Sequence, residues 1–461
     1  MAIKLYNTMT RVKEDFAPIK APIVSLYTCG PTVYNYQHIG NYRTYIFEDS
    51  LKRVLMYLGY QVRHVMNITD VGHLVSQGDE GEDKMEVGAA REGKTAAEIA
   101  LFYTEAFIKD CRSLHLMPPD VLCRATEHIP EQVELIGRLE NKGFVYRTSD
   151  GIYFDTKKFP AYSKLAGAGH MAGLQEGARV EANKEKRSAT DFALWKFSSK
   201  DKKRQMEWES PWGVGFPGWH IECSAMAMRF LGESFDLHCG GVDHIPIHHT
   251  NEIAQSEAAT GKPFAHFWMH GEFLLMNSAK MAKSSGGFVT LSDLEARGFN
   301  ALDYRYHCLT AHYRKQLEFS WEALESSKTA RRRLHEVIQQ IKAEPPSPTC
   351  EEFEVRFREA VSDDLNMPAA LAVIWDALKS GLSPNAKHRM LLVAEGVLGL
   401  GLFDERPEDR EVAPEVFELI NRREKARREK DFNLADQLRK ELDGKGVLVA
   451  DTKEGQTWRK R

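Results

Sequence analysis

The sequence predicts an α/β protein with a doubly wound, Rossmann-like parallel sheet, interrupted by an insertion and followed by an all-α bundle and a small C-terminal α+β region. Residues 23–29 are an apolar run typical of a buried strand, residues 61–67 are a second predicted strand, and a helical pattern that stops at Gly59 separates them. Strand, helix and strand in succession are the building unit of such a sheet. A further strand at residues 235–239 and a helix at 247–260 indicate that the sheet continues later in the chain.

Changes in composition divide the 461 residues into five parts. They are residues 1–116 (first half of the sheet domain), 117–204 (insertion), 205–320 (second half), 321–405 (helical bundle) and 406–461 (C-terminal region). The acidic stretch after residue 71 is predicted to be a solvated loop, and residues 95–114 a helix. Further predicted elements are strands at 151–155, 272–276 and 447–451 and helices at 321–343 and within 352–402.

Charge and cysteine usage limit the class of protein. The formal net charge of −4 gives no global basic field, so a nucleic-acid surface must be a local patch. Residues 422–430 are dense in basic side chains, which fits either a phosphate-facing surface or an ordinary charged helix. Seven scattered cysteines do not form a secreted disulfide framework. The N-terminus has no apolar core of the kind found in signal peptides, and no run approaches the length of a membrane span. A soluble cytoplasmic protein is therefore expected.

Four residues form a candidate metal site. His248 and Glu252 are four apart, which places them on one face of a helix, and Cys223 can add a thiolate. Zinc accepts nitrogen, oxygen and sulfur ligands together. Cys29 is the candidate fourth ligand, because it ends a predicted strand at the sheet edge where α/β proteins bind ligands. For each residue taken alone, a quiet core cysteine or an ordinary helix-surface residue is the favoured interpretation, so the metal site depends on their coincidence with the motifs described below.

Two segments are candidates for binding phosphate. The sequence HIGN at residues 38–41 lies between the first strand and the first helix, where Gly40 permits close approach of a nucleotide and the helix N-terminus favours anions. His38 can donate a hydrogen bond to a phosphate oxygen. Lys280 and Lys283 are three apart on a glycine-bounded loop and can neutralise the charge of a departing pyrophosphate. Either segment in isolation is also typical of a solvated surface.

Six short motifs occur in the order found in cysteinyl-tRNA synthetases. They are CGPTVY at 29–34, HIGN at 38–41, NITD at 67–70, GWHIECS at 218–224, HHTNE at 248–252 and KMAKS at 280–284. The chain therefore resembles a full-length class I enzyme of that family. The resemblance implies that L-cysteine is activated with ATP and Mg²⁺ and then transferred to the 2′-OH of the terminal adenosine of tRNA(Cys). It also implies one Zn²⁺ per chain that selects the thiol, a C-terminal anticodon-binding region and a monomer.

The resemblance assigns roles position by position. The implied zinc ligands are Cys29, Cys223, His248 and Glu252, of which Cys29 and His248, with Thr69 and Trp219, also bind the amino acid. The implied ATP-binding residues are Thr32, His38, Gly40, Asn41, Asp243, Lys280 and Lys283, and the catalytic ones are His38, Asn41, Lys280 and Lys283. Two departures stand out: Asn41 replaces the second histidine of the common HIGH signature, and Ala282 replaces the first serine of KMSKS.

Three other classes of protein share part of this pattern. A ligase that joins cysteine to an amino sugar shares the catalytic half, but residues 320–461 argue against it. A small-molecule nucleotidyltransferase shares HIG-type signatures, but neither the tail nor the zinc residues. A catalytically silent tRNA-binding paralogue is disfavoured by the intact His38, Lys280 and Lys283.

Overall fold

The computed structural model describes residues 3–72, 84–167, 184–199, 204–276, 288–341, 345–347, 350–404, 414–429, 431–452 and 455–460. The chain forms two compact units, residues 1–400 and 401–461. Within the described ranges, none of the helices combines the length and the apolar character that crossing a membrane requires.

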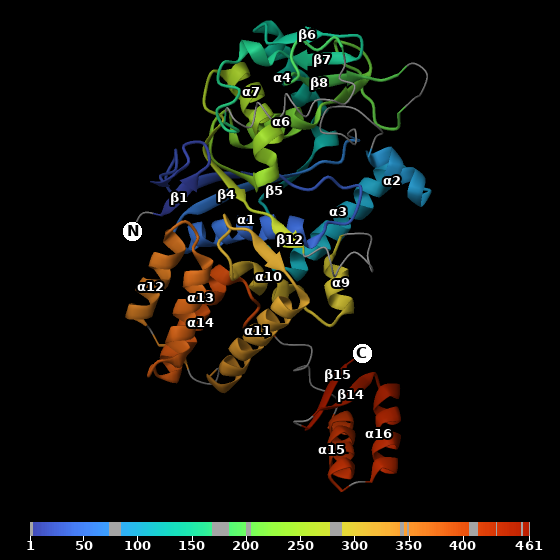
Figure 1. Ribbon diagram of the computed structural model, residues 1–461, viewed down its shortest axis with the longest axis vertical. Helices are drawn as coiled ribbons and strands as arrows, with labels where there is room; N and C mark the ends of the chain where they lie inside the picture. The colour runs from blue at the N-terminus through green and yellow to red at the C-terminus, as the bar shows by residue number, and fades with distance from the viewer. Residues whose placement is uncertain are drawn as a thin grey trace. The chain divides into compact units, whose positions relative to one another are not determined.

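A five-stranded parallel sheet lies at the centre of the first unit and confirms the predicted fold class (Figure 1). The strands lie in the spatial order β11-β10-β3-β4-β5, and every neighbouring pair is parallel. They are β3 (Ile23–Thr28), β4 (Gln61–Ile68), β5 (Val121–Arg124), β10 (Phe235–Gly241) and β11 (Ala265–Gly271). All residues of β10 are buried, as expected of a strand covered by helices on both faces.

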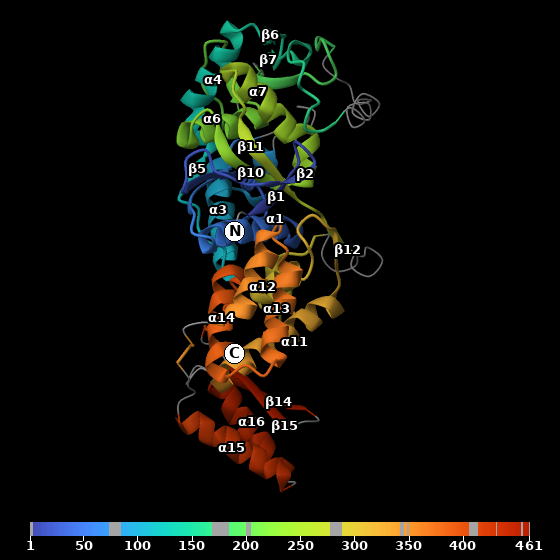
Figure 2. The same cartoon turned by 90° about the vertical axis from the view of Figure 1, so that its left-hand side faces the viewer.

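Helices cover both faces of this sheet. The connection from β3 to β4 is α1 (Ile39–Tyr57), which confirms the predicted strand–helix–strand unit and is followed by Gly59 with φ of +93°, a conformation open to glycine. Helices α6 (Trp219–Leu231) and α7 (Thr250–Thr260) lie on the opposite face from α1 (Figures 1 and 2). The chain winds from β3 to β4 in one direction and from β10 to β11 in the other. The carboxyl ends of β3 and β10 therefore flank a topological switch point, where such sheets bind ligands.

A second, antiparallel sheet corrects the predicted limits of the insertion. Its strands, in the order β6-β7-β8-β9, are β6 (Val145–Arg147), β7 (Gly151–Phe154), β8 (Phe192–Phe197) and β9 (Gly215–Pro217), and α4 (Ile129–Asn141) packs on α6 and α7 beside them. The insertion was expected at 117–204. Instead β5 belongs to the central sheet, and β9 extends the inserted sheet beyond residue 204. The sheet to which a strand belongs depends on the strands it pairs with, and those partners are distant in sequence.

The acidic segment also differs from its prediction. Part of it, residues 73–83, lies outside the described residues, but 84–92 form helix α2 (Lys84–Glu92) where a loop was expected. Met85 and Ala89 are buried at helical spacing, and α2 packs against α3 (Ala96–Ser113). Two apolar side chains on one face therefore stabilise a helix whose composition is mostly polar. The helix expected at 95–114 is confirmed as α3, with Thr95 as its N-cap.

The rest of the first unit is mainly helical, and α10 (Ala301–Leu309) and α14 (Pro384–Leu398) within it pack on α1 (Figures 1 and 2). The helices are α9 (Leu291–Ala296), α10 (Ala301–Leu309), α11 (Trp321–Ile341), α12 (Glu351–Ser362), α13 (Met367–Lys379) and α14 (Pro384–Leu398). Short strand pairs are β1 (Lys4–Asn7) with β2 (Val12–Asp15), and β12 (Leu274–Met276) with β13 (Leu317–Phe319). The fully buried Arg305 of α10 joins these parts, since it donates to the carboxylate of Asp49 in α1 and to the carbonyl of Leu398 in α14.

The second unit combines two helices with a hairpin. Its elements are α15 (Pro414–Arg428), α16 (Phe432–Gly444), β14 (Val447–Thr452) and β15 (Gly455–Lys460). Arg423, in the dense basic stretch 422–430, is only 1% exposed and donates to Asp451. This arginine therefore stabilises the unit and does not face a ligand.

Candidate functional site

A cavity of about 790 Å³ lies at the carboxyl ends of β3, β4 and β10, at the switch point of the sheet. Nine of the predicted site residues line it: Cys29, Thr32, His38, Asn41, Thr69, Trp219, Cys223, Asp243 and His248. Gly40 and Glu252 are not part of the lining. Lys280 and Lys283 lie outside the described residues.

The four predicted metal ligands come together at one end of this cavity. One ligand atom from each of Cys29, Cys223, His248 and Glu252 lies within 4.8 Å of the others, and all four residues are buried. Cys29 directly follows β3, Cys223 lies in α6, and Glu252 lies in the first turn of α7. His248 belongs to a wide turn, Ile245–His249, that leads into α7, and its Nε2 is 2.9 Å from Glu252 Oε1.

The electrostatics of this cluster suit a divalent cation. Burial raises the pKa of Cys29, whereas a hydrogen bond from Cys29 lowers the pKa of Cys223 to about 7. Burial disfavours a charged His248, but the adjoining Glu252 and Cys223 raise its pKa to about 10. The lowered pKa values of Cys223 and Glu252 favour a thiolate beside a carboxylate, and buried charges need a counter-charge. Two thiols, an imidazole and a carboxylate are donors that zinc accepts.

A second layer of histidines surrounds the cluster and was not recognised in the sequence. Nε2 of His238 lies 2.9 Å from Glu252 Oε2, and Nε2 of His249 lies 3.4 Å from Cys29 Sγ. His249 in turn bonds His270 at 2.8 Å. The signal was present: a histidine inside the apolar strand 235–241 is unusual, because a buried imidazole needs a polar partner.

The other end of the cavity is the N-terminus of α1. His38 is the N-cap, and its Nδ1 accepts from the Asn41 N–H at 3.2 Å while Asn41 Oδ1 accepts from the His38 N–H at 3.1 Å. The ring of His38 stacks on Phe288, and the Ile39 N–H donates to the Val289 carbonyl at 2.8 Å. Burial lowers the pKa of His38, which favours the neutral form of the imidazole. Its position at a helix N-terminus favours a negatively charged ligand.

Gly30 shows why the loop after β3 needs a glycine. A Cβ at this position would lie 1.7 Å from the carbonyl oxygen of Asn67, and the Gly30 N–H donates to Asn67 Oδ1 at 3.0 Å. The loop therefore lies directly on the end of β4. This close approach keeps Cys29 and Thr32 at the cavity wall.

Comparisons with known proteins are consistent with this geometry. Residues 15–329 match the family model described as the class I (C) tRNA synthetase catalytic domain, and residues 409–459 match that of the cysteinyl-tRNA ligase anticodon binding domain. A cysteine–tRNA ligase 1 from Burkholderia lata is 53% identical over 457 residues, covering 99% of this chain and 96% of the relative. A cysteine–tRNA ligase from Treponema denticola is 43% identical over 492 residues, with all of both chains covered.

Solved structures resemble the chain in fold alone. A Mycobacterium tuberculosis methionyl-tRNA synthetase with methionyl-adenylate has a TM-score of 0.53 at 15% identity, covering 82% of this chain and 90% of that one. The ternary LeuRS–tRNA complex of Agrobacterium radiobacter K84 has a TM-score of 0.57 at 12% identity, covering 84% of each chain. Both support a doubly wound domain with appended helices.

Proposed function

The chain belongs to the cysteinyl-tRNA synthetase family and is a class I ligase that joins cysteine to tRNA, and from this premise we propose how its residues select the substrate and activate it. The observation that carries the proposal is the single cavity lined at one end by Cys29, Cys223 and His248 and at the other by His38 and Asn41. A thiol-binding end and a phosphate-binding end in one space are what joining cysteine to ATP requires.

In this proposal Cys29, Cys223, His248 and Glu252 hold one zinc ion. When bound, zinc supplies affinity for the substrate thiolate, which serine cannot provide. A packed pocket distinguishes near-isosteric side chains poorly, so selection by sulfur explains how cysteine is preferred. Trp219, whose ring centroid is 4.7 Å from that of His248, and Thr69 shape the wall beside the amino acid.

Activation needs positioning and charge stabilisation. The carboxylate of cysteine is already ionised near pH 7, so it attacks the α-phosphorus of ATP without a general base. His38, at the N-terminus of α1, donates to a phosphate oxygen, while Asn41 holds the His38 backbone in place. Thr32, Gly40 and Asp243 belong to the ATP-binding wall in this proposal. Lys280 and Lys283 would neutralise the leaving pyrophosphate, and Mg²⁺, when bound, would supply further positive charge.

Transfer to tRNA completes the reaction. The 2′-OH of the terminal adenosine attacks the adenylate carbonyl and releases AMP. We assign binding of the tRNA body to the helices of 321–405 and of the anticodon to 406–461, which the family match of residues 409–459 supports. We also propose a monomer in the cytoplasm, where a reducing environment keeps the cysteines free for metal.

The test is cysteine-dependent ATP–pyrophosphate exchange, with and without tRNA, alongside a zinc assay. We expect exchange with cysteine without tRNA, negligible exchange with serine, and one zinc per chain. Exchange with serine as fast as with cysteine would contradict selection by zinc. Absence of any exchange in zinc-loaded protein would favour the silent paralogue.

A further inference from the structure

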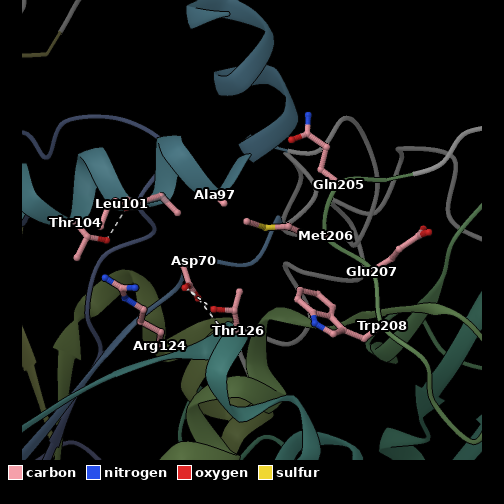
Figure 3. A pocket seen from close by; sticks show the side chains of 11 residues that line it. Asp70, Ala97, Leu101, Thr104, Arg124, Thr126, Gln205, Met206, Glu207 and Trp208 are labelled. Carbon is pink, nitrogen blue, oxygen red and sulfur yellow. Dashed lines mark hydrogen bonds between the residues drawn. The ribbon is translucent and has the colours of Figure 1, made fainter. Parts of the chain in front are cut away.

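A smaller cavity of about 280 Å³ adjoins the site and shares no lining residue with the large cavity. Figure 3 shows Ala97, Leu101 and Thr104 of α3 along one side, Asp70, Arg124 and Thr126 along another, and Gln205 to Trp208 along a third. Its volume suits one nucleobase, because ligand sites for larger molecules occupy roughly 300–1,000 Å³.

The two cavities meet at consecutive residues. Thr69 lines the large cavity and Asp70 lines the small one. Consecutive Cα atoms are about 3.8 Å apart, so the walls of the two spaces are less than one nucleoside apart at this point. Both cavities open at the carboxyl end of β4 (Gln61–Ile68).

The lining favours a neutral planar group with a hydrogen-bond donor. Trp208 offers a partly exposed aromatic ring, and the apolar side chains of Leu101 and Met206 also line the cavity. Asp70 is 5% exposed, and its two oxygens accept from the N–H and Oγ1 of Thr126 at 2.9 and 2.6 Å. A carboxylate has about four lone-pair sites, so Asp70 keeps acceptor capacity for a ligand beyond its bonds to Thr126 and to its own backbone N–H. Asp70 and Glu207 outweigh Arg124 in charge, which disfavours a free phosphate here.

The reaction limits what can occupy this space. Transfer requires a ribose hydroxyl of the tRNA's terminal adenosine beside the adenylate in the large cavity. The base attached to that ribose must then lie within one sugar of the reacting carbonyl. Unpaired bases in RNA are typically held by aromatic stacking and by hydrogen bonds to their edges.

We propose that this small cavity binds the base of the 3′-terminal adenosine of tRNA, with Trp208 as the stacking surface and Asp70 as the acceptor for the exocyclic amine. The proposal rests on the proposed function and adds the subsite for the second step. Trp208 is thereby a specificity residue for transfer and takes no part in activation.

The experiment compares Trp208→Leu with Trp208→Phe in the full chain. Single-turnover transfer from enzyme-bound adenylate to tRNA and tRNA-independent pyrophosphate exchange are measured for each variant. For Trp208→Leu we expect the ratio of transfer to exchange to fall about tenfold, the effect of losing one stacked base. Phenylalanine keeps a stacking ring, so its ratio should remain within about threefold of the parent.

Trp212→Leu is the matched control. Trp212 lies on the same segment but donates to Glu140 Oε2 at 3.0 Å, away from the cavity, so its ratio should equal that of the parent. An unchanged ratio in Trp208→Leu, or an equal fall of both rates, would overturn the subsite. If the parent protein shows no cysteine-dependent pyrophosphate exchange, the proposed function itself is refuted.

A second measurement needs no protein variant. A tRNA that ends in purine riboside lacks the exocyclic amine, so we expect severalfold slower transfer by the parent with unchanged exchange. Equal rates of transfer to this tRNA and to the normal tRNA would show that Asp70 does not recognise the base.

Discussion

Glu252 Oε1 lies 2.9 Å from Nε2 of His248, and the two residues are separated by one helical turn. The other carboxylate oxygen lies 2.9 Å from Nε2 of His238. Glu252 therefore connects a histidine at the cavity wall with one inside the central sheet. Because a hydrogen-bonded carboxylate keeps its orientation, the contact with His238 of β10 fixes Glu252 within the candidate metal site.

Replacing one ligand tests the metal site. Cys223→Ser should lower the zinc content and raise the KM for cysteine. Loss of a residue that merely supports a metal ligand weakens metal binding about tenfold, so loss of a ligand should raise the KM at least as much. Metal analysis and pyrophosphate exchange measure both quantities. Cys308→Ser is the control, since Cys308 is also buried but lies in α10. Unchanged zinc and KM in Cys223→Ser would remove this residue from the site.

The stack of His38 on Phe288 predicts a defect in ATP use. The ring centroids are 5.3 Å apart with 11° between the planes, although Phe288 is 65% exposed. Aromatic pairs contribute about 0.5–1.5 kcal/mol, so Phe288→Ala should raise the KM for ATP roughly three- to tenfold. Phe273→Ala, at a similarly exposed phenylalanine, should leave it unchanged. Equal effects of the two variants would show that the stack does not position His38.

His64 predicts a pH dependence of stability. Burial, followed by the nearby Lys52, lowers the pKa of His64 to about 3. The unfolded chain protonates this residue near pH 6.5, so between these values the unfolded state binds one more proton. The free energy of unfolding should therefore fall as pH falls below about 6.5, by up to roughly 1.4 kcal/mol per pH unit.

Urea unfolding of the parent and of His64→Gln at several pH values measures this contribution. Glutamine can keep a hydrogen bond to Thr28, whose Oγ1 is 2.9 Å from His64 Nε2, but it does not titrate. The variant should lose less stability than the parent between pH 6.5 and 5.5, and the two should have the same slope above pH 7.5. Identical slopes throughout would contradict the assignment.

The buried ion pair between Asp49 and Arg305 predicts a large loss of stability. Arg305 is fully buried, so Asp49→Asn leaves a charge without its counter-ion and should lower the free energy of unfolding by about 3–5 kcal/mol. Asp376→Asn, which breaks the exposed pair with Arg356, should cost at most about 1 kcal/mol. Urea unfolding compares the two, and similar losses would mean that the buried pair is not decisive.

The sequence by itself determined three of the five central strands (β3, β4 and β10), the helix after HIGN and the candidate ligands, but it did not predict β5 or β11. Strand Ile23–Thr28 and helix Ile39–Tyr57 follow from local periodicity and from a glycine stop, which act over a few residues. Cys29 was predicted as a ligand because parallel strands place their carboxyl ends at one edge of the sheet.

Only the tertiary structure decided which residues surround those ligands and where the insertion begins. Val121–Arg124 joined the central sheet by pairing with β4, and Lys84–Glu92 became a helix by burying Met85 and Ala89 on α3. His238 reached Glu252, and Asp70 came to face Trp208 across a cavity, through contacts between distant segments. Such contacts depend on the packing of whole elements, which no local pattern in the chain specifies.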